Sequence, residues 1–204
     1  MNAETLCVSL DGITLLPPGH AATIKSYLER TAPPSGPVPE APAGFALARL
    51  TGTDEARYLA IFATLGTRWL WWSRLMLTPQ ARAAILDDPD VEAYAVTRDG
   101  MDCGLVELDL RDPAAPDLAF LGLYDHTTGK GVGSWLIGMA LARLWRDAPG
   151  KVTVNTCTFD SPAALGFYRR HGFEIVKQAI EIVPDPRLAG LLPRDAAPHV
   201  PLLP

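Results

Sequence analysis

The segment between residues 118 and 159 restricts the fold of this 204-residue chain more than any other segment. A strand is expected at residues 118–124, and a glycine-rich turn follows it. A long apolar helix comes next and ends near Arg146, before a second strand expected at residues 151–159. Two strands joined through a single helix are parallel neighbours in a sheet. The sequence therefore predicts a sheet that contains a parallel pair.

Other strands and helices are expected on both sides of this unit. Further strands are expected at residues 22–30, 45–51, 92–97, 102–110 and 173–183. The turn Arg98-Asp99-Gly100 joins two of them as a hairpin. Helices are expected from Thr53 to about Thr67, from the N-cap Thr78 to about Asp88, and from Ser161 to His171. This order predicts a mixed α/β fold, with a central mixed sheet of about six to seven strands and helices on both faces.

The chain divides into three predicted parts. Residues 1–21 are expected to form an N-terminal extension, because they show no clear hydrophobic period. Residues 22–183 are expected to form one folded domain, which is long enough to bury a full core. Residues 184–204 are rich in proline and are expected to form an irregular C-terminal tail.

Composition argues against several classes of function. The 18 Lys and Arg residues and 23 Asp and Glu residues give a net charge of −5, so no nucleic-acid partner is expected. The three cysteines show no CxxC spacing, which indicates free thiols and a cytoplasmic protein. The four histidines lack metal-ligand spacing, so no metal is expected. No apolar run approaches about 20 residues, so no membrane span is expected.

The glycine-rich turn is the first candidate binding site. It reads Thr-Gly-Lys-Gly-Val-Gly from Thr128 to Gly133. Glycines let the backbone approach a bulky anion, and the free N–H groups and dipole of the following helix favour a pyrophosphate. The spacing fits neither a P-loop, which needs Ser or Thr after Gly-Lys, nor the GxGxxG dinucleotide fingerprint. A plain glycine turn before a buried helix is the alternative interpretation of this motif alone.

A short helix near the end of the domain is the second candidate site. Ser161 followed by Pro162 indicates its N-terminus, and Gly172 is typical of a left-handed residue after its C-terminus. The helix carries Phe167 and Tyr168, an aromatic pair that is commonly buried in a core. Together with the glycine-rich turn, Tyr168 instead indicates an enzyme that uses a nucleotide-bearing thioester.

The two motifs resemble those of the GNAT superfamily of acyl-CoA-dependent N-acyltransferases. Residues 128–133 resemble the family's Arg/Gln-x-x-Gly-x-Gly/Ala loop, which wraps the coenzyme A pyrophosphate. Residues 161–173 resemble its Asn-x-x-Ala-x-x-x-Tyr-x-x-x-Gly-Phe signature, and the resemblance covers about residues 90–183. Thr128 stands where the family has Arg or Gln, and Ser161 where it has Asn. The contacts of these two side chains are therefore expected to be weaker.

The resemblance implies acetyl-CoA as the cosubstrate and a set of residues that hold it. The backbone of Leu121 and Leu123 would bind the pantetheine arm as an added strand does, and Tyr168 would protonate the departing thiolate. The implied cofactor-binding residues are Leu121, Leu123, Thr128, Gly129, Lys130, Gly131, Val132, Gly133, Ser134, Ser161 and Ala164.

Glu107 is the candidate general base. It shares one face of its predicted strand with Leu105 and Asp109, and a carboxylate in such an apolar strand needs a reason. Acting through water, it would take the proton that an amine acceptor must lose, and many GNAT enzymes carry a glutamate at this place. A solvent-facing or salt-bridged Glu107 is the equally weighted alternative, and Asp109 is the alternative base.

The acceptor side of the site is expected near three tryptophans. Trp69, Trp71 and Trp72 fall in the region that, by the resemblance, walls the acceptor pocket, although a core or a dimer interface is the favoured interpretation. Asn155, within a strand expected to be buried, faces either the acetyl group or a backbone partner.

The sequence therefore predicts an N-acetyltransferase that moves acetyl from acetyl-CoA to a primary amine by direct attack in a ternary complex. Its acceptor would be a small molecule or a peptide amine, and a homodimer is a further expected partner. The alternative function is an acyl-CoA-binding or protein-interaction module with little catalysis.

Overall fold

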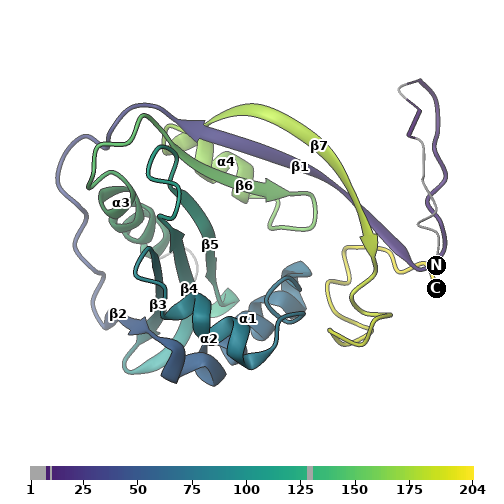
Figure 1. Cartoon of the computed structure of the whole chain (residues 1–204), viewed down its shortest axis with the longest axis horizontal. Helices are drawn as coiled ribbons and strands as arrows, with labels where there is room; N and C mark the ends of the chain where they lie inside the picture. The colour runs from purple at the N-terminus through teal and green to yellow at the C-terminus, as the bar shows by residue number, and fades with distance from the viewer. Residues whose placement is uncertain (1–7, 10, 128–130) are drawn as a thin grey trace.

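A single seven-stranded sheet organises the chain (Figure 1). The computed structural model describes residues 8, 9, 11–127 and 131–204. Its strands are β1 His20–Arg30, β2 Phe45–Leu50, β3 Val91–Arg98, β4 Met101–Asp109, β5 Asp117–Leu123, β6 Val152–Cys157 and β7 Glu174–Pro184. Its α-helices are α1 Glu55–Trp69, α2 Pro79–Leu86, α3 Val132–Leu144 and α4 Ala164–Arg170, with short 3₁₀ turns at Gly52–Asp54 and Asp125–Thr127.

The strand order is β2-β3-β4-β5-β6-β1-β7. The pair β5–β6 is parallel and the other neighbouring pairs are antiparallel, so the predicted mixed sheet and its parallel pair are confirmed. β1 does not pair with β2, the next strand along the chain, but lies between β6 and β7. The three strands β1, β6 and β7, here called the arch, curve over the side of the molecule that faces α1 (Figure 1).

Helices cover both faces of the sheet, as predicted. The α3 face is the one on which α3 and α4 pack, and its core contains Val106, Leu108 and Leu118. The α1 face is the opposite one, where residues of α1 and α2 pack around Leu105. Successive side chains of β4 point to opposite faces of the sheet and therefore belong to two different cores. A polar side chain buried next to Leu105 on the α1 face needs hydrogen-bond partners there.

Turn and cap chemistry explains several boundaries. In the hairpin β3–β4, Asp99 and Gly100 have φ of 51° and 83°, the left-handed pair that a two-residue hairpin favours. The Thr78 hydroxyl accepts a hydrogen bond from the Ala81 N–H (3.2 Å), and Pro79 begins α2, so the predicted cap is confirmed.

Two predicted caps are wrong. Thr53 does not begin α1, because the Thr51 N–H donates to the Asp54 carboxylate (3.0 Å) and closes a 3₁₀ turn before the helix. Ser161 does not cap α4, whose N-cap is Ala163. The Ser161 carbonyl instead accepts from the Ala164 N–H (2.9 Å), which forms a separate turn ahead of the helix.

The C-terminal end of α4 is as predicted. Gly172 has φ of 82°, and the Phe173 N–H donates to the Tyr168 carbonyl (3.2 Å). This left-handed glycine turns the chain directly into β7 and holds the tyrosine helix against the sheet.

Residues 185–204 contain neither helix nor strand, as expected, but they are packed against the domain. The Arg187 guanidinium forms an ion pair with Asp185 (2.7 Å) and donates to the carbonyls of Ala196 and Val200. The Ala197 N–H donates to the carbonyl of Thr67 in α1 (2.8 Å). The tail therefore closes the end of the molecule between α1 and the arch.

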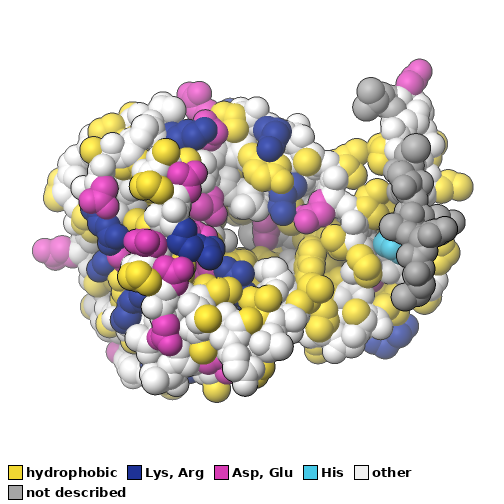
Figure 2. All heavy atoms as spheres, in the orientation of Figure 1, with side chains coloured by type: hydrophobic (Ala, Val, Ile, Leu, Met, Phe, Trp, Pro, Cys, Tyr) yellow, Lys and Arg dark blue, Asp and Glu magenta, His cyan; other side chains and the backbone are white. Residues whose placement is uncertain are grey.

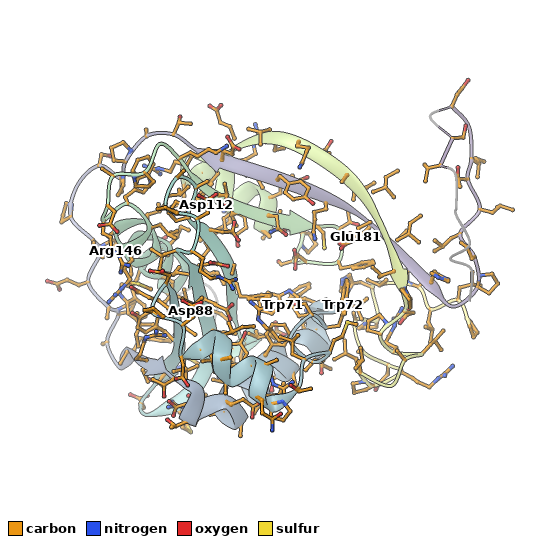
Figure 3. The ribbon with its side chains drawn as sticks, viewed as in Figure 1. Trp71, Trp72, Asp88, Asp112, Arg146 and Glu181 are labelled. Atoms are coloured by element: carbon orange, nitrogen blue, oxygen red, sulfur yellow. The ribbon has the colours of Figure 1, made fainter. Side chains whose placement is uncertain are left out.

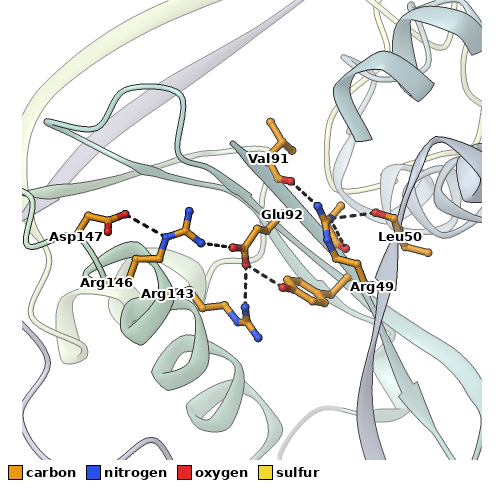
Figure 4. Close-up of polar contacts among 9 residues, drawn as sticks. Arg49, Leu50, Val91, Glu92, Arg143, Arg146 and Asp147 are labelled. Atoms are coloured by element: carbon orange, nitrogen blue, oxygen red, sulfur yellow. Dashed lines mark hydrogen bonds and ion pairs between the residues drawn. The ribbon is translucent and has the colours of Figure 1, made fainter. Parts of the chain in front are cut away.

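An ion-pair network around the buried carboxylate of Glu92 fixes α3 on the sheet (Figure 4). Glu92 on β3 accepts hydrogen bonds from Arg143 (3.0 Å), Arg146 (2.5 Å) and the Tyr94 hydroxyl (2.8 Å). Burial acts to raise the pKa of Glu92, but the Tyr94 hydrogen bond and the two arginine charges outweigh burial and lower this pKa. The ionised Glu92 therefore stabilises the fold at neutral pH.

Replacing Glu92 by glutamine is expected to lower the free energy of unfolding by about 2 kcal/mol at pH 7, the size of a lost hydrogen bond to a charged group. Urea titration measures this loss. Because the Glu92 pKa is lowered, the contribution is present above the ordinary glutamate pKa and disappears as pH falls through the lowered one. Asp147→Asn is the control, since Asp147 pairs with Arg146 at the surface and should change stability by less than about 0.5 kcal/mol. A loss of the same size in both variants would contradict the expectation.

Candidate functional site

The parallel strands β5 and β6 separate after two residue pairs. Asp117 lies opposite Thr153 and Leu118 opposite Val154, and no further pairing continues along these strands, although β5 runs on to Leu123. The strands diverge from that point and leave a wedge-shaped opening in the middle of the sheet, here called the split.

A β-bulge lies where the split begins. On the other side of β5, Glu107 pairs with Phe120 and Leu108 pairs with Leu118, so Ala119 is an extra residue in the register. A bulge bends its strand and increases the local twist. The local sequence thus directs the second half of β5 away from β6.

Backbone groups of β5 face the split. The Tyr124 N–H donates to the Cys103 carbonyl on β4 (2.8 Å). Residues of an antiparallel strand alternate in the direction of their hydrogen bonds, so the backbone groups of Leu121 and Leu123 point away from β4. These are the two residues that the family resemblance implied would bind an extended ligand arm, and they lie along the split.

The N-terminus of α3 adjoins the tyrosine helix. Gly131 is the N-cap with φ of 77°, and a Cβ placed on it would meet nothing within 4 Å. A Cβ on Gly133 would lie 3.3 Å from the Phe167 ring of α4. The two predicted motifs are therefore neighbours in space. Of the other predicted residues, Val132 is buried, Ser134 is exposed and Ala164 packs against the α3-face core.

Thr128, Gly129 and Lys130 lie outside the described residues. Their predicted contacts with a pyrophosphate stay a prediction. The same holds for the role of Ser161, whose side chain accepts from the Ala163 N–H (3.3 Å).

Tyr168 is buried, with 7% of its surface exposed, and its ring contacts Phe167 and Phe173. Its hydroxyl forms no hydrogen bond with any residue that the structure describes. Burial, together with the negative charges of Asp160 and Asp117, raises the pKa of Tyr168. The hydroxyl therefore stays protonated at neutral pH, the state that a proton donor needs.

Asp117 is a site residue that the sequence analysis missed. Leu118 and Val154 belong to the α3-face core, so Asp117 and Thr153 project to the α1 face. The Thr153 hydroxyl donates to Asp117 (2.6 Å), and no cation pairs with this carboxylate in the described part of the chain. Burial, with the charge of Asp109, raises the pKa of Asp117. A carboxylate directly ahead of the strand that leads to a glycine-rich turn was the available sequence signal.

Glu107 has no free carboxylate oxygen. It is 1% exposed, and it accepts hydrogen bonds from Arg74 (2.6 Å) and from the Tyr58 hydroxyl. This is the salt-bridged arrangement that was the alternative to a basic role, and the basic role stays a prediction. Asp109, the other candidate, forms an ion pair with Arg111 at the surface.

The three tryptophans do not form one cluster. Trp71 packs against Phe120, and its indole N–H donates to the Asp160 carboxylate beyond the end of β6 (3.0 Å). Trp72 and Trp69 pack towards the C-terminal tail, Trp72 against its core cluster and Trp69 against His199. Figure 3 shows Trp71 and Trp72 on the side of the α1–α2 connection that faces the arch, across from Glu181.

Asp160 links Trp71 to the end of β6, and no sequence pattern indicated this role. Its other carboxylate oxygen accepts from the Thr156 hydroxyl and the Cys157 N–H, each at 2.8 Å. Asn155 is exposed on the α1 face of β6, so the expectation that it is buried is wrong. Figure 2 shows a hollow in the surface between the arch and the helices below it.

Comparison with known proteins adds the fold family. No protein-family model and no curated protein matches the sequence. A GCN5-related N-acetyltransferase (GNAT) from Sphaerobacter thermophilus matches in structure with a TM-score of 0.57 and 18% identity over 81% of this chain and 53% of its own. The chain has the GNAT fold.

Two further structures agree with this fold. A tandem GNAT protein from the clavulanic acid biosynthesis pathway matches with a TM-score of 0.56 and 16% identity, over 80% of this chain and 55% of its own. A functionally unknown conserved protein from Staphylococcus epidermidis matches with a TM-score of 0.60 and 13% identity, over 82% and 63%. The chain thus spans between about half and two thirds of the length of these three matched structures.

Two further findings concern metal binding and membrane spans in the described residues. No group of three or more His, Cys, Asp or Glu side chains among them is arranged to hold a metal ion. No helix in the same ranges has the length and apolar character needed to cross a membrane.

Proposed function

We propose that the chain is an N-acetyltransferase that transfers acetyl from acetyl-CoA to a primary amine in a ternary complex. The observation that carries this proposal is the split between β5 and β6, which begins at the Ala119 bulge. It offers a slot through the sheet with the backbone of β5 on one side and the start of α3 at its open end.

The described residues fit such a ligand. Leu121 and Leu123 can pair with an amide-containing pantetheine arm as an added strand would. The first N–H groups of α3 and its dipole suit a pyrophosphate, and the open space around Gly131 leaves room for it. Acetyl-CoA would supply the activated acetyl group as a thioester.

The residues around the inner end of the split would handle two protons. Asp117 accepts one from the acceptor ammonium, which frees the nitrogen lone pair for attack on the thioester carbonyl. As the new C–N bond forms and the C–S bond breaks, the Tyr168 hydroxyl gives a proton to the sulfur. The nitrogen, which is cationic after the attack, then loses its second proton through solvent to the tyrosinate, which restores the hydroxyl and leaves the neutral amide. The raised pKa of Asp117 makes this carboxylate a stronger base. Tyr168 is protonated at neutral pH, as a proton donor must be, although its raised pKa makes it a weaker acid than an exposed tyrosine.

Glu107 takes a positioning role in this proposal. Its ion pair with Arg74 orders the α1–α2 connection above the sheet, and the Arg74 guanidinium lies 5.2 Å from the Phe120 ring centroid. Glu107 remains the alternative base, acting through water.

One observation favours the second candidate function, a module with little catalysis. Both oxygens of Glu107 are occupied, so the predicted base on β4 is not available without breaking the Arg74 pair. While Glu107 is held by Arg74, catalysis depends on Asp117 as the base.

Acetyl-CoA at 100 times its dissociation constant is expected to stabilise the protein by about 2.7 kcal/mol, which raises Tm by roughly 5–10 °C for a chain of this size. ATP should stabilise it less, because it lacks the pantetheine arm. Thiol release in the presence of an amine panel measures turnover. Stabilisation without thiol release for any amine would favour the module, and no stabilisation would overturn both functions.

Two glycines provide a matched pair for this titration. Gly131 and Gly190 both have positive φ, and a Cβ would meet nothing within 4 Å of either. Alanine at each position carries a similar backbone strain of about 1–2 kcal/mol. Only Gly131→Ala should weaken acetyl-CoA binding, since Gly190 lies in the C-terminal tail.

A further inference from the structure

A pocket of about 470 Å³ opens on the α1 face beside the inner end of the split. Strands β1, β5, β6 and β7 all contribute to it. Its polar and aromatic lining consists of Tyr27, Glu29, Asp117, Thr153, Asn155 and Lys177. A volume of this size is within the range of small-molecule sites.

The pocket holds two opposite charges that are not paired with each other. The Lys177 ammonium lies 4.3 Å from the centroid of the Tyr27 ring and forms no ion pair with a described carboxylate. Among the residues that the structure describes, only the Thr153 hydroxyl bonds the Asp117 carboxylate. Glu29, the third charge, is neutralised by Lys151 (2.6 Å). One anion and one cation thus remain available to a ligand.

Strand order separates these two charges. Lys177 belongs to β7, but its side chain folds back over Tyr27 of β1, and β1 is separated from β5 by β6 alone. Neighbouring strands lie about 4.8 Å apart, so the backbones of β1 and β5 are about 10 Å apart. No ion pair joins Lys177 to Asp117 in the described structure, and a ligand with charges at both ends can bridge them.

We propose that this pocket binds an acceptor that carries a carboxylate as well as its amine, with the ammonium at Asp117 and the carboxylate at Lys177. This rests on the proposed function and adds the substrate class to it. If the strand separation of about 10 Å is taken as the distance between the two charges, one hydrogen bond at each end leaves about 4 Å between the acceptor's nitrogen and its carboxylate. That distance favours amino acids with two or more carbons between the amine and the carboxylate.

The Tyr27 ring and the Asn155 amide would complete recognition. Tyr27 and Asn155 are directly opposite each other on β1 and β6, between the two charges. The ring provides an apolar floor for the methylene groups, and the exposed amide can bond either end of the acceptor.

Matched acceptors test the proposal. Initial rates of thiol release are measured for two pairs of acceptors, β-alanine with ethylamine and 4-aminobutyrate with propylamine. Within each pair the two compounds differ only by the carboxylate. The acids are expected to give kcat/KM at least tenfold higher than the amines. Lys177→Met should reduce this preference to less than about threefold. Lys25→Met is the control, because Lys25 pairs with Glu181 outside the pocket and its loss should leave the preference intact.

The outcomes separate this inference from the proposed function. Turnover of all four acceptors without a preference, or with a preference that Lys177→Met does not change, overturns the substrate class and leaves the acetyltransferase in place. If no amine is turned over, the acetyltransferase proposal fails, and calorimetric titration of 4-aminobutyrate then tests the pocket itself. Binding that Lys177→Met abolishes supports the pocket, and absence of binding overturns it.

Discussion

Tyr168→Phe is expected to lower kcat by about 100-fold or more while leaving Tm unchanged or slightly raised. The loss follows from the missing proton donor, since positioned acid–base groups typically contribute 10²–10⁴ in rate. Stability should not fall, because the hydroxyl makes no hydrogen bond with a described residue that the substitution would break, and phenylalanine keeps the contacts of the buried ring with Phe167 and Phe173. Affinity for acetyl-CoA should persist.

Tyr94→Phe is the matched control for this variant. Tyr94 is also buried, but its hydroxyl donates to Glu92 far from the split. Loss of the Tyr94 hydroxyl should lower Tm and leave kcat unaltered, which is the opposite of the result expected for Tyr168→Phe. Unchanged turnover in Tyr168→Phe would remove Tyr168 from the mechanism.

Asp117→Asn is expected to lower kcat by a factor of about 10²–10⁴ and, at pH 7, to raise Tm. Asparagine keeps an oxygen for the Thr153 hydroxyl but cannot accept a proton from the acceptor. The folded-state pKa of Asp117 is raised by burial, so its contribution to stability is fully present below the unfolded pKa and is lost as pH rises through the folded one. At neutral pH the buried charge therefore costs stability, which the variant recovers.

The pH dependence of kcat/KM adds a second readout. The base must be ionised, so the rate should fall as pH drops through the raised pKa of Asp117, above the ordinary aspartate range. This acid limb should be absent in Asp117→Asn.

Glu107→Gln distinguishes the two candidate bases. It should keep the acid limb and lower the free energy of unfolding by about 3 kcal/mol, because it leaves the Arg74 charge without its partner. If the acid limb of the kcat/KM profile disappears in Glu107→Gln and persists in Asp117→Asn, Glu107 is the base.

Local chemistry made much of the fold predictable. The Asp99-Gly100 turn, the Thr78-Pro79 helix start and the left-handed Gly172 each depend on neighbouring residues, and each is observed. The parallel pair followed from the single helix between two strands, but the early end of its pairing at the split accompanies the Ala119 bulge, which the sequence analysis did not predict.

The rest depends on contacts between distant residues, which a local pattern does not encode. Residues 22–30 were recognised as a strand, but nothing in them indicates a place between β6 and β7. The role of Asp117 appears only when Tyr27 and Lys177 are brought beside it. Glu107 was noticed as a carboxylate among apolar residues, but its partner Arg74 lies in an irregular connection without a periodic signal.

The position of β1 affects how the protein is made. The Thr23 and Thr158 hydroxyls bond each other across 135 sequence positions, and β1 has its neighbours only in β6 and β7. During synthesis, this 11-residue strand leaves the ribosome long before either neighbour exists. We therefore expect folding to finish late and slowly, as is usual when distant segments must meet, and the nascent chain to need protection from aggregation until then.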